Sequence, residues 1–395
     1  MIAGRTTRVL FLVEGHTDIR FVVGLAGICD LTLVVSEVPF RASGLDNRIR
    51  EAGLDIPVHE LPGGRLSFQW RSFTWLWRHA REFDVVLSQE LLRGTLSANL
   101  ACVPRGVPVV VSVLVPAIEY FRCRRERRQI GPVEAWLGEQ VMRWLMTVNG
   151  RWVTRCVAWG PYLRSVAARY SKRVQLGHYY GVDTGRFRPA SAAERTALRQ
   201  RHGLPTDRFL VLFPSRVSHE KDPETVLRAT AALRRRGVDA VVLNLGGGHE
   251  DFLRLAAELG LADSADWVLG RPALHPMREL ADYFRAADVV CQSSLEEGLS
   301  LATIEGLACG VPVVASEVGG MAVRLRGHAL LTPRRDVDAM AEVFFQIARD
   351  PDKGRAQAER GRVWIEAECR RDVAFEDWRR VFAEVAAGSL RSGQR

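Results

Sequence analysis

The chain has 395 residues, 47% of them hydrophobic and 26% charged, with a formal net charge of +9 at pH 7. This composition is typical of a globular protein and excludes a wholly disordered, collagen-like or coiled-coil chain, and the length is sufficient for two domains. The seven cysteines are scattered and form no Cys-x-x-Cys pair. That pattern disfavours a zinc site or a disulfide framework, and it indicates a reducing, cytoplasmic environment.

No segment has the pattern of a membrane anchor. The first apolar run, 9–13, is too short for the core of a signal peptide, and the best long candidate, 133–159, contains five charged side chains. The positive charge is concentrated in the first half, where residues 1–180 carry 24 Lys and Arg against 15 Asp and Glu. Such an excess indicates an anionic partner, for which a membrane surface, an acidic glycolipid and a nucleic acid all stay open.

Short apolar runs alternate with helix-like segments along the whole chain. We expect strands at 9–13, 31–35, 85–87, 107–113 and 157–159 in the first half, and at 210–213, 241–245, 267–269, 289–291 and 313–315 in the second. Nearly continuous apolar runs are typical of strands covered on both faces, and alternation with helices produces parallel sheets. The sequence therefore predicts an α/β chain with two doubly wound, Rossmann-like domains.

A segment rich in glycine and poor in periodicity, 181–189, separates the two series of strands. We predict an N-terminal domain over 1–180, a linker over 181–191 and a C-terminal domain over 192–372. Residues 373–395 would form a final helix that crosses back to the first domain and ends in a frayed polar tail. Trp378 and Phe382, four residues apart, give this helix one apolar face.

The segment 293–316 carries the most informative pattern for function. Seven residues separate Glu297 from Glu305, and Gly298 allows a ligand to approach the backbone closely. A helix beginning near Ser300 would direct its free N–H groups at an anion. Two carboxylates over such a helix end suit the hydroxyls of a sugar, with a diphosphate held between them. The alternative is an acidic surface loop followed by a solvated helix.

A second pattern lies at 213–223, after the first strand of the second half. A leaving diphosphate needs positive charge, which Arg216 and Lys221 could supply without a metal. The alternative is two exposed cations ahead of a helix that Asp222 caps and Pro223 begins.

These two segments resemble the donor-binding motifs of glycosyltransferase family 4, also described as glycosyl transferases group 1. Segments 180–189, 244–248 and 268–271 are similar to that family's linker, glycine turn and base-contacting loop. The resemblance implies the GT-B fold, in which two Rossmann-like domains with parallel sheets face each other across a cleft. It also implies a retaining, metal-independent transfer of sugar from a nucleotide-diphosphate sugar of UDP or GDP type, with no cofactor.

The family's functional residues can be carried over to matching positions. The catalytic residues would be Arg216, Lys221 and Glu297, and no metal ligand is expected. The donor-binding residues would be Gly15, His16, Gly270, Arg271, Gly298, Leu299, Ser300, Leu301 and Glu305.

Some positions depart from the family pattern. Leu114 stands where many members have a histidine, and Met321 follows the Gly-Gly pair where an acidic residue is usual. Asp336 and Asp338 have the spacing of a metal-binding Asp-x-Asp motif. Their place before an apolar periodic segment predicts a helix N-cap instead.

The first half also holds seven of the ten tryptophans and a cluster of arginines, which comprises Arg122, Arg124, Arg125, Arg127 and Arg128. Nearby, apolar residues between 137 and 148 fall on one face of a helix. This pattern favours docking onto an anionic membrane on its cytoplasmic side, whereas the alternative is an ordinary core helix beside a solvated loop.

The predicted partners are a nucleotide sugar and a glycan, lipid-linked or small-molecule acceptor, and no nucleic acid is expected. Alternative functions are a related sugar-nucleotide epimerase or hydrolase, and a non-enzymatic anion- or membrane-binding protein on the same fold.

Overall fold

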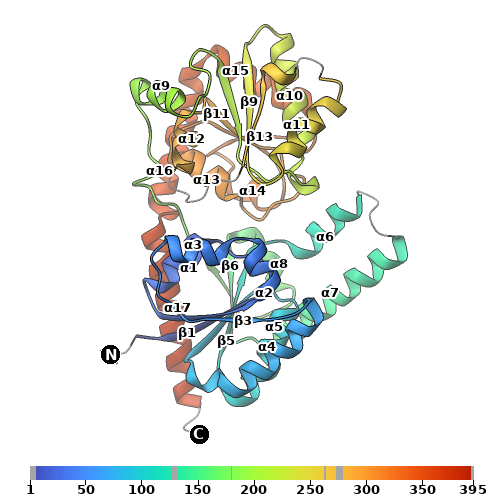
Figure 1. The fold of residues 1–395 in the computed structure, drawn as a ribbon, viewed down its shortest axis with the longest axis vertical. Helices are drawn as coiled ribbons and strands as arrows, with labels where there is room; N and C mark the ends of the chain where they lie inside the picture. Colours follow the sequence, from blue (N-terminus) through green and yellow to red (C-terminus); the bar gives the residue numbers. More distant parts are fainter. Residues whose placement is uncertain (1–5, 127–130, 179, 262–263, 273–278, 393–395) are drawn as a thin grey trace. The chain divides into compact units, whose positions relative to one another are not determined.

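The computed structural model of the chain describes residues 6–126, 131–178, 180–261, 264–272 and 279–392. They form two compact units, which Figure 1 shows as ribbons. The first unit comprises 1–118, 130–181 and 372–395, and the second comprises 119–129 and 182–371. Each unit is built on a parallel sheet with helices, so the predicted pair of Rossmann-like domains is confirmed.

The sheet of the first unit has seven strands in the order β3-β2-β1-β4-β5-β6-β7, all paired in parallel. Its strands are β1 (Arg8–Val13), β2 (Asp30–Ser36), β3 (Val58–Leu61), β4 (Val85–Gln89), β5 (Val109–Val113), β6 (Arg155–Trp159) and β7 (Val174–Gly177). The chain moves from β1 outward to β3 and then returns to the other side of β1 with β4. Between β1 and β4 lies the point of reversal, where open α/β sheets commonly bind ligands at the carboxyl ends of their strands.

The helices of the first unit cover both faces of this sheet. They are α1 (Ile19–Ala26), α2 (Glu37–Ala42), α3 (Leu45–Glu51), α4 (Arg65–His79), α5 (Arg93–Cys102), α7 (Pro132–Trp152), α8 (Pro161–Ala168) and α17 (Arg371–Ser392). Leu10 and Leu12 of β1 pack into a core with α4, α5 and α7. Phe11, which points to the opposite face, meets Phe21 of α1 edge to face at 5.6 Å between ring centroids.

The sheet of the second unit has six strands in the order β10-β9-β8-β11-β12-β13, again all parallel. Its strands are β8 (Phe209–Phe213), β9 (Ala240–Leu245), β10 (Val268–Arg271), β11 (Val289–Gln292), β12 (Val313–Ser316) and β13 (Leu330–Thr332). Its helices are α9 (Ala192–Arg201), α10 (Pro223–Arg235), α11 (His249–Glu258), α12 (Leu280–Ala286), α13 (Leu301–Ala308), α14 (Gly319–Arg324), α15 (Val337–Arg349) and α16 (Pro351–Glu368). The reversal here falls between β8 and β11.

The final helix, α17, packs against α1 in the first unit. A Cβ on Gly24 of α1 would lie 1.7 Å from the ring of Phe375, so the helices touch where only glycine fits. Trp378 and Phe382 are both buried in this contact layer, as the apolar spacing predicted. The helix continues to Ser392, so the polar segment expected as a frayed tail is helical as far as that residue.

One segment belongs to a different unit from the one that the sequence indicated. Residues 119–129, which include most of α6 (Ala117–Glu126), cluster with the second unit although they follow β5 of the first. A boundary drawn from composition alone placed them in the domain 1–180. The described helices are all too short or too polar to span a bilayer.

Candidate active site

Two loops meet at the reversal point of the second sheet. The loop after β8 leads into a short 3-10 helix, His219–Lys221, and the loop after β11 leads into α13. The hydroxyl of Ser293 donates to the backbone carbonyls of Lys221 (3.1 Å) and Asp222 (2.8 Å), and the N–H of Leu295 donates to the carbonyl of Glu220 (2.8 Å). These bonds fasten together the two segments from which the sequence predicted catalytic residues.

Glu297 and Lys221 form an ion pair within this junction. The Glu297 side chain is 8% exposed. Its Oε2 accepts from Lys221 Nζ and from Ser294 Oγ (3.4 Å), and its Oε1 accepts from the phenol of Tyr120 (2.8 Å). The Lys221 side chain is only 16% exposed, so it is no surface cation of the kind that the alternative interpretation required. The structure thus joins two predicted residues and adds Tyr120, which the sequence analysis missed.

Arg216 lies beside this pair but has a different partner. Its guanidinium binds the buried Glu220 at 2.7 Å, and 58% of its side chain is exposed. The anchoring on Glu220 fixes one side of the guanidinium and leaves the rest accessible to a ligand.

A buried glutamine connects the elements of the site. Gln292, at the end of β11, accepts from Ser215 (3.0 Å) and Ser300 (3.2 Å) and donates to Ser294 (2.7 Å). Because the Ser300 hydroxyl is bound to Gln292, it makes no side-chain cap on α13, whose amino end suits an anion. Periodicity gave no signal for Gln292, since it occupies an ordinary buried strand position.

The segment from Gly298 to Leu301 carries the predicted donor-binding backbone. A Cβ on Gly320 would lie 1.4 Å from the carbonyl oxygen of Gly298, and the Gly320 N–H donates to the carbonyl of Glu297 (2.9 Å). A glycine at 320 is therefore required for the loop at Glu297 to pack in this position. Leu299, Ser300 and Glu305 are all buried along this loop and α13.

The predicted base-contacting residues, Gly270 and Arg271, end β10 and are half-buried. A Cβ on Gly270 would lie 2.9 Å from the carbonyl oxygen of His249. The close packing of β10 against α11 is therefore sufficient to require a glycine at 270, whether or not a ligand binds there. Asp336 accepts from the N–H of Ala339 at 2.9 Å and caps α15, which confirms the N-cap interpretation of the Asp-x-Asp pattern.

The remaining predicted residues, Gly15 and His16, lie in the first unit directly after β1 and are exposed. Close to the same sheet edge, Glu90 follows β4 with a backbone φ of +58°. Its Oε1 accepts from the N–H groups of Leu114 (2.8 Å) and Val115 (3.1 Å). The Glu90 carboxyl group therefore holds the backbone at Leu114, the position where many family members have a histidine. No pattern in the sequence indicated this contact.

Burial raises the pKa of Glu90 to about 8, against the lowering effect of the two N–H donors. Because the folded protein binds this proton more tightly than the unfolded chain, the associated stability is complete below pH 4.5 and is lost as the pH rises toward 8. We expect Glu90→Gln to abolish this loss. Between pH 5 and pH 9 the melting temperature of the variant should therefore fall at least about 2 °C less than that of the wild type. Thermal unfolding at both pH values tests this, with the exposed Glu51→Gln as control, and parallel pH curves would contradict it.

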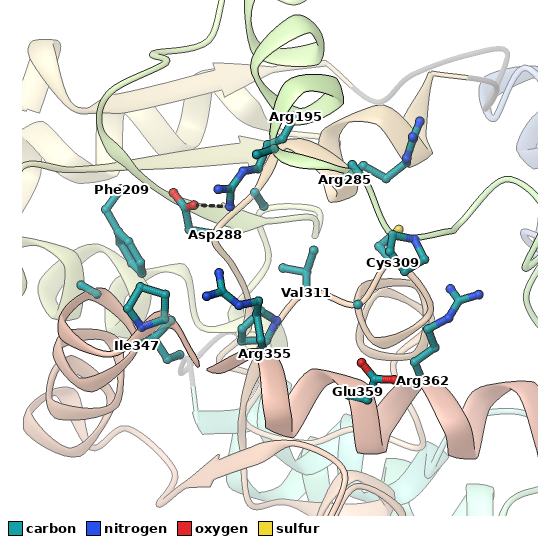
Figure 2. A pocket seen from close by; sticks show the side chains of 18 residues that line it. Arg195, Phe209, Arg285, Asp288, Cys309, Val311, Ile347, Arg355, Glu359 and Arg362 are labelled. Atoms are coloured by element: carbon teal, nitrogen blue, oxygen red, sulfur yellow. Dashed lines mark hydrogen bonds and ion pairs between the residues drawn. The ribbon is translucent and has the colours of Figure 1, made fainter. Parts of the chain in front are cut away.

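A cavity of about 470 Å³ lies elsewhere in the second unit, and Figure 2 shows side chains that line it. It adjoins Phe209, Asp288 and Pro312, at the amino ends of β8, β11 and β12 and so at the sheet edge opposite to the loops described above. The four arginines that line it, Arg195, Arg285, Arg355 and Arg362, are each ion-paired with a carboxylate of the chain. None of the predicted donor-site residues lines this cavity.

Within the described ranges, no three His, Cys, Asp or Glu side chains gather in a way that could hold a metal ion. All seven cysteines are buried and unbridged.

Comparison with solved structures defines the class of protein. The chain superposes on the crystal structure of Anabaena Alr3699/HepE in complex with UDP with a TM-score of 0.77, covering 95% of this chain and 100% of that one. Since the sequences are only 16% identical, this likeness establishes the fold alone, which is the GT-B fold.

Sequence comparison then identifies the family. The family model described as glycosyl transferases group 1 matches residues 194–364. D-inositol 3-phosphate glycosyltransferase 1 of Catenulispora acidiphila is 31% identical over 359 residues, which are 86% of this chain and 79% of that protein. A GDP-mannose-dependent alpha-(1-6)-phosphatidylinositol monomannoside mannosyltransferase of Mycolicibacterium smegmatis is 34% identical over 243 residues, 59% of this chain and 61% of that protein. The chain belongs to the glycosyl transferases group 1 family and is a glycosyltransferase.

Proposed function

We propose that the chain is a retaining, metal-independent hexosyltransferase that uses a UDP- or GDP-sugar and a polyol, glycan or lipid-linked acceptor. The observation that carries this proposal is the Glu297–Lys221 pair at the reversal point of the second sheet, beside the amino end of α13. Support comes from relatives whose names specify inositol phosphate and phosphatidylinositol mannoside acceptors, and from a neighbour in complex with UDP.

In this proposal the donor diphosphate lies between the cations Arg216 and Lys221 and the N–H groups of Leu299 to Leu301. When the diphosphate takes over the Lys221 ammonium, one Glu297 oxygen becomes available to a sugar hydroxyl. Glu305 would hold the ribose. These groups stabilise the negative charge that develops on the leaving phosphate, which is often the largest contribution to such catalysis.

The two substrates account for every bond and proton in the transfer, so no protein side chain needs to act as a base. The bond from the sugar C1 to the phosphate oxygen breaks, and the acceptor oxygen bonds to C1 on the same face. The departing phosphate oxygen takes the acceptor proton, which suits a chain with Leu114 in place of a histidine. Gly15 and His16 of the first unit, and Gly270 and Arg271 of the second, complete the proposed set of donor-binding residues.

Binding of the donor should raise the melting temperature. A ligand at 100 times its dissociation constant adds about 2.7 kcal/mol of stability, equivalent to several degrees in a unit of this size. A thermal-shift comparison of UDP-glucose and GDP-mannose, with glucose 1-phosphate as control, identifies the nucleotide. Consumption of the donor only when an acceptor is present distinguishes a transferase from a hydrolase or epimerase, and no shift with either nucleotide sugar would favour a non-enzymatic protein.

Transfer should survive chelation, because Arg216 and Lys221 supply the charge that a metal would otherwise provide. We expect the rate with millimolar EDTA to stay within about twofold of the untreated rate, given that one lost electrostatic contact typically lowers the rate 100-fold or more. Loss of activity that magnesium or manganese restores would show that the two cations are insufficient.

We further propose that the first unit docks onto an anionic membrane surface on its cytoplasmic side. The helix α7 exposes a stripe of large apolar side chains, namely Val133, Trp136, Leu137, Val141 and Trp144. Of the face that the sequence predicted, Leu145 is buried and Val148 half-buried. The exposed stripe favours a membrane-facing helix over a core helix.

The arginine cluster is only partly described. Arg122 and Arg125 are exposed, whereas the side chain of Arg124 and the residues Arg127 and Arg128 lie outside the described part of the chain. The cluster also falls within 119–129 of the second unit. The proposal that the first unit docks onto a membrane therefore rests on the stripe of α7 and not on this cluster.

Removing two aromatic side chains from this stripe should release the protein from vesicles. We expect Trp136→Ser with Trp144→Ser to reduce co-sedimentation with phosphatidylglycerol vesicles by at least tenfold, since each ring buries a large apolar area. The matched control replaces Val323 and Val363, exposed apolar residues of the second unit, by serine. Equal binding to phosphatidylglycerol and phosphatidylcholine, or no binding to either, would contradict docking on an anionic surface.

A further inference from the structure

Tyr120 reaches the proposed catalytic carboxylate from a distant part of the sequence. Its phenol donates to Glu297 Oε1 at 2.8 Å, across 177 positions of sequence. The other oxygen, Oε2, faces Lys221 and Ser294. Each oxygen of the carboxylate therefore has its own donor, which restricts rotation of the group more than the Lys221 contact alone would.

The segment that carries Tyr120 is held to the second unit at a second point. Glu126, on the same helix α6, accepts from the guanidinium of Arg334 through both oxygens (3.0 Å each) and from Arg335 (3.0 Å). Its carboxylate also lies 3.9 Å from His219 Nε2, beside Lys221. Tyr120 is thus placed by contacts that do not involve Glu297.

The phenol is suited to a permanent donor role. Burial and the neighbouring Glu297 carboxylate hold the pKa of Tyr120 well above its usual value of 10. Tyr120 consequently keeps its proton at neutral pH. A hydrogen bond to a charged group is stronger than one between neutral groups, and its direction is correspondingly better defined.

We propose that Tyr120 is a positioning residue that fixes the direction of the Glu297 carboxylate toward the donor sugar. The inference rests on the proposed role of Glu297. Without the phenol, Oε1 loses its donor, so that when the diphosphate takes over the Lys221 ammonium the freed Oε2 can turn away from the sugar hydroxyl that it should meet. In the proposed arrangement Glu297 serves the sugar and not the nucleotide, so nucleotide affinity should be unaffected.

The test combines Tyr120→Phe with a double-mutant cycle. In the full chain we expect Tyr120→Phe to lower turnover of UDP-glucose or GDP-mannose, whichever is the better donor, 10- to 100-fold, which corresponds to a lost hydrogen bond to a charged group. The dissociation constant of UDP or GDP, measured by calorimetry, should change less than about threefold. In a Glu297→Ala background, Tyr120→Phe should change single-turnover rates less than about twofold, because residues that act through one another are non-additive.

Two control variants separate positioning from folding. Tyr283→Phe removes a phenol from α12 of the same unit and should leave turnover unchanged. Glu126→Gln loosens the second attachment of α6 without touching Glu297 and should lower turnover less than about threefold. If it reproduces the whole loss, Tyr120 only docks the segment and the proposal is wrong.

The remaining outcomes are also decisive. Wild-type turnover in Tyr120→Phe, or the same loss with Glu297 present and absent, would overturn the proposal. A fully active Glu297→Ala variant would instead refute the proposed function itself, whatever Tyr120 does.

Discussion

Replacing Glu297 by Gln should lower turnover roughly 100- to 1,000-fold, as expected for the loss of one preorganised contact to the transition state. The amide keeps the shape of the side chain and can still accept from Tyr120 or Lys221, so the second unit should remain folded. Steady-state kinetics with the preferred nucleotide sugar measures the effect. Glu317→Gln, an exposed carboxylate paired with Arg326, is the matched control and should retain full activity.

The interpretation of that result depends on nucleotide affinity. If Glu297 acts on the sugar, the dissociation constant for UDP or GDP should be nearly unchanged while turnover falls. Wild-type turnover in the variant would remove Glu297 from the mechanism. A loss of nucleotide binding equal to the loss of rate would indicate a general collapse of the loop after β11.

Replacing Lys221 by Met should affect both catalysis and stability. The variant removes the ammonium that the donor diphosphate would meet, so we expect turnover to fall at least about 100-fold. It also leaves the buried Glu297 carboxylate without its cation. Breaking a buried pair in this way costs about 3 kcal/mol, which urea unfolding of the variant should detect as a lower transition midpoint. An unchanged midpoint would show that the pair is open to solvent.

A second substitution separates the two effects. Adding Glu297→Gln to Lys221→Met removes the uncompensated charge and should restore at least half of the lost stability, but none of the activity. Lys353→Met, at an exposed lysine of α16, serves as the control for loss of a positive charge. Full additivity of the two stability changes would contradict a direct interaction between Lys221 and Glu297.

Nine of the ten strands that could be predicted are interior strands of a sheet, and the tenth, β10, is an outermost strand. All ten predicted strands are present, because continuous apolar runs mark the interior of a parallel sheet. The three that were missed, β3, β7 and β13, are each an outermost strand of a sheet. Edge strands are short and half exposed, so β3 and β7 contain polar residues such as His59 and Gln175 and lack a distinctive pattern.

The site was predictable where its residues lie within one motif. Glu297 stood in a short segment with glycine and serine, Lys221 stood in one with serine and proline, and a helix follows each. The structure joins them because β8 and β11 are neighbours at the reversal point. Tyr120 and Glu90 carried no local signal, since each meets its partners only through tertiary packing. Arg216 is a prediction that the structure does not test, because its observed partner is Glu220.

The segment 119–129 shows that position along the chain is not enough to assign a segment to a domain. It follows β5, and its arginines were counted with the first domain, yet Tyr120 and Glu126 bond to the second unit. No pattern within the segment indicates this, because the attachment depends on Glu297 and on Arg334 and Arg335, about 200 positions away.

The most direct test of the account is to follow transfer by NMR with the purified full chain, a nucleotide sugar and D-inositol 3-phosphate as the acceptor. UDP-glucose and GDP-mannose are supplied in turn, with Glu297→Gln as the matched blank. The account predicts that one of them is consumed only in the presence of acceptor, and that the product carries the sugar with the anomeric configuration of the donor. Consumption of the donor at the same rate without acceptor, or a product of inverted configuration, would contradict it.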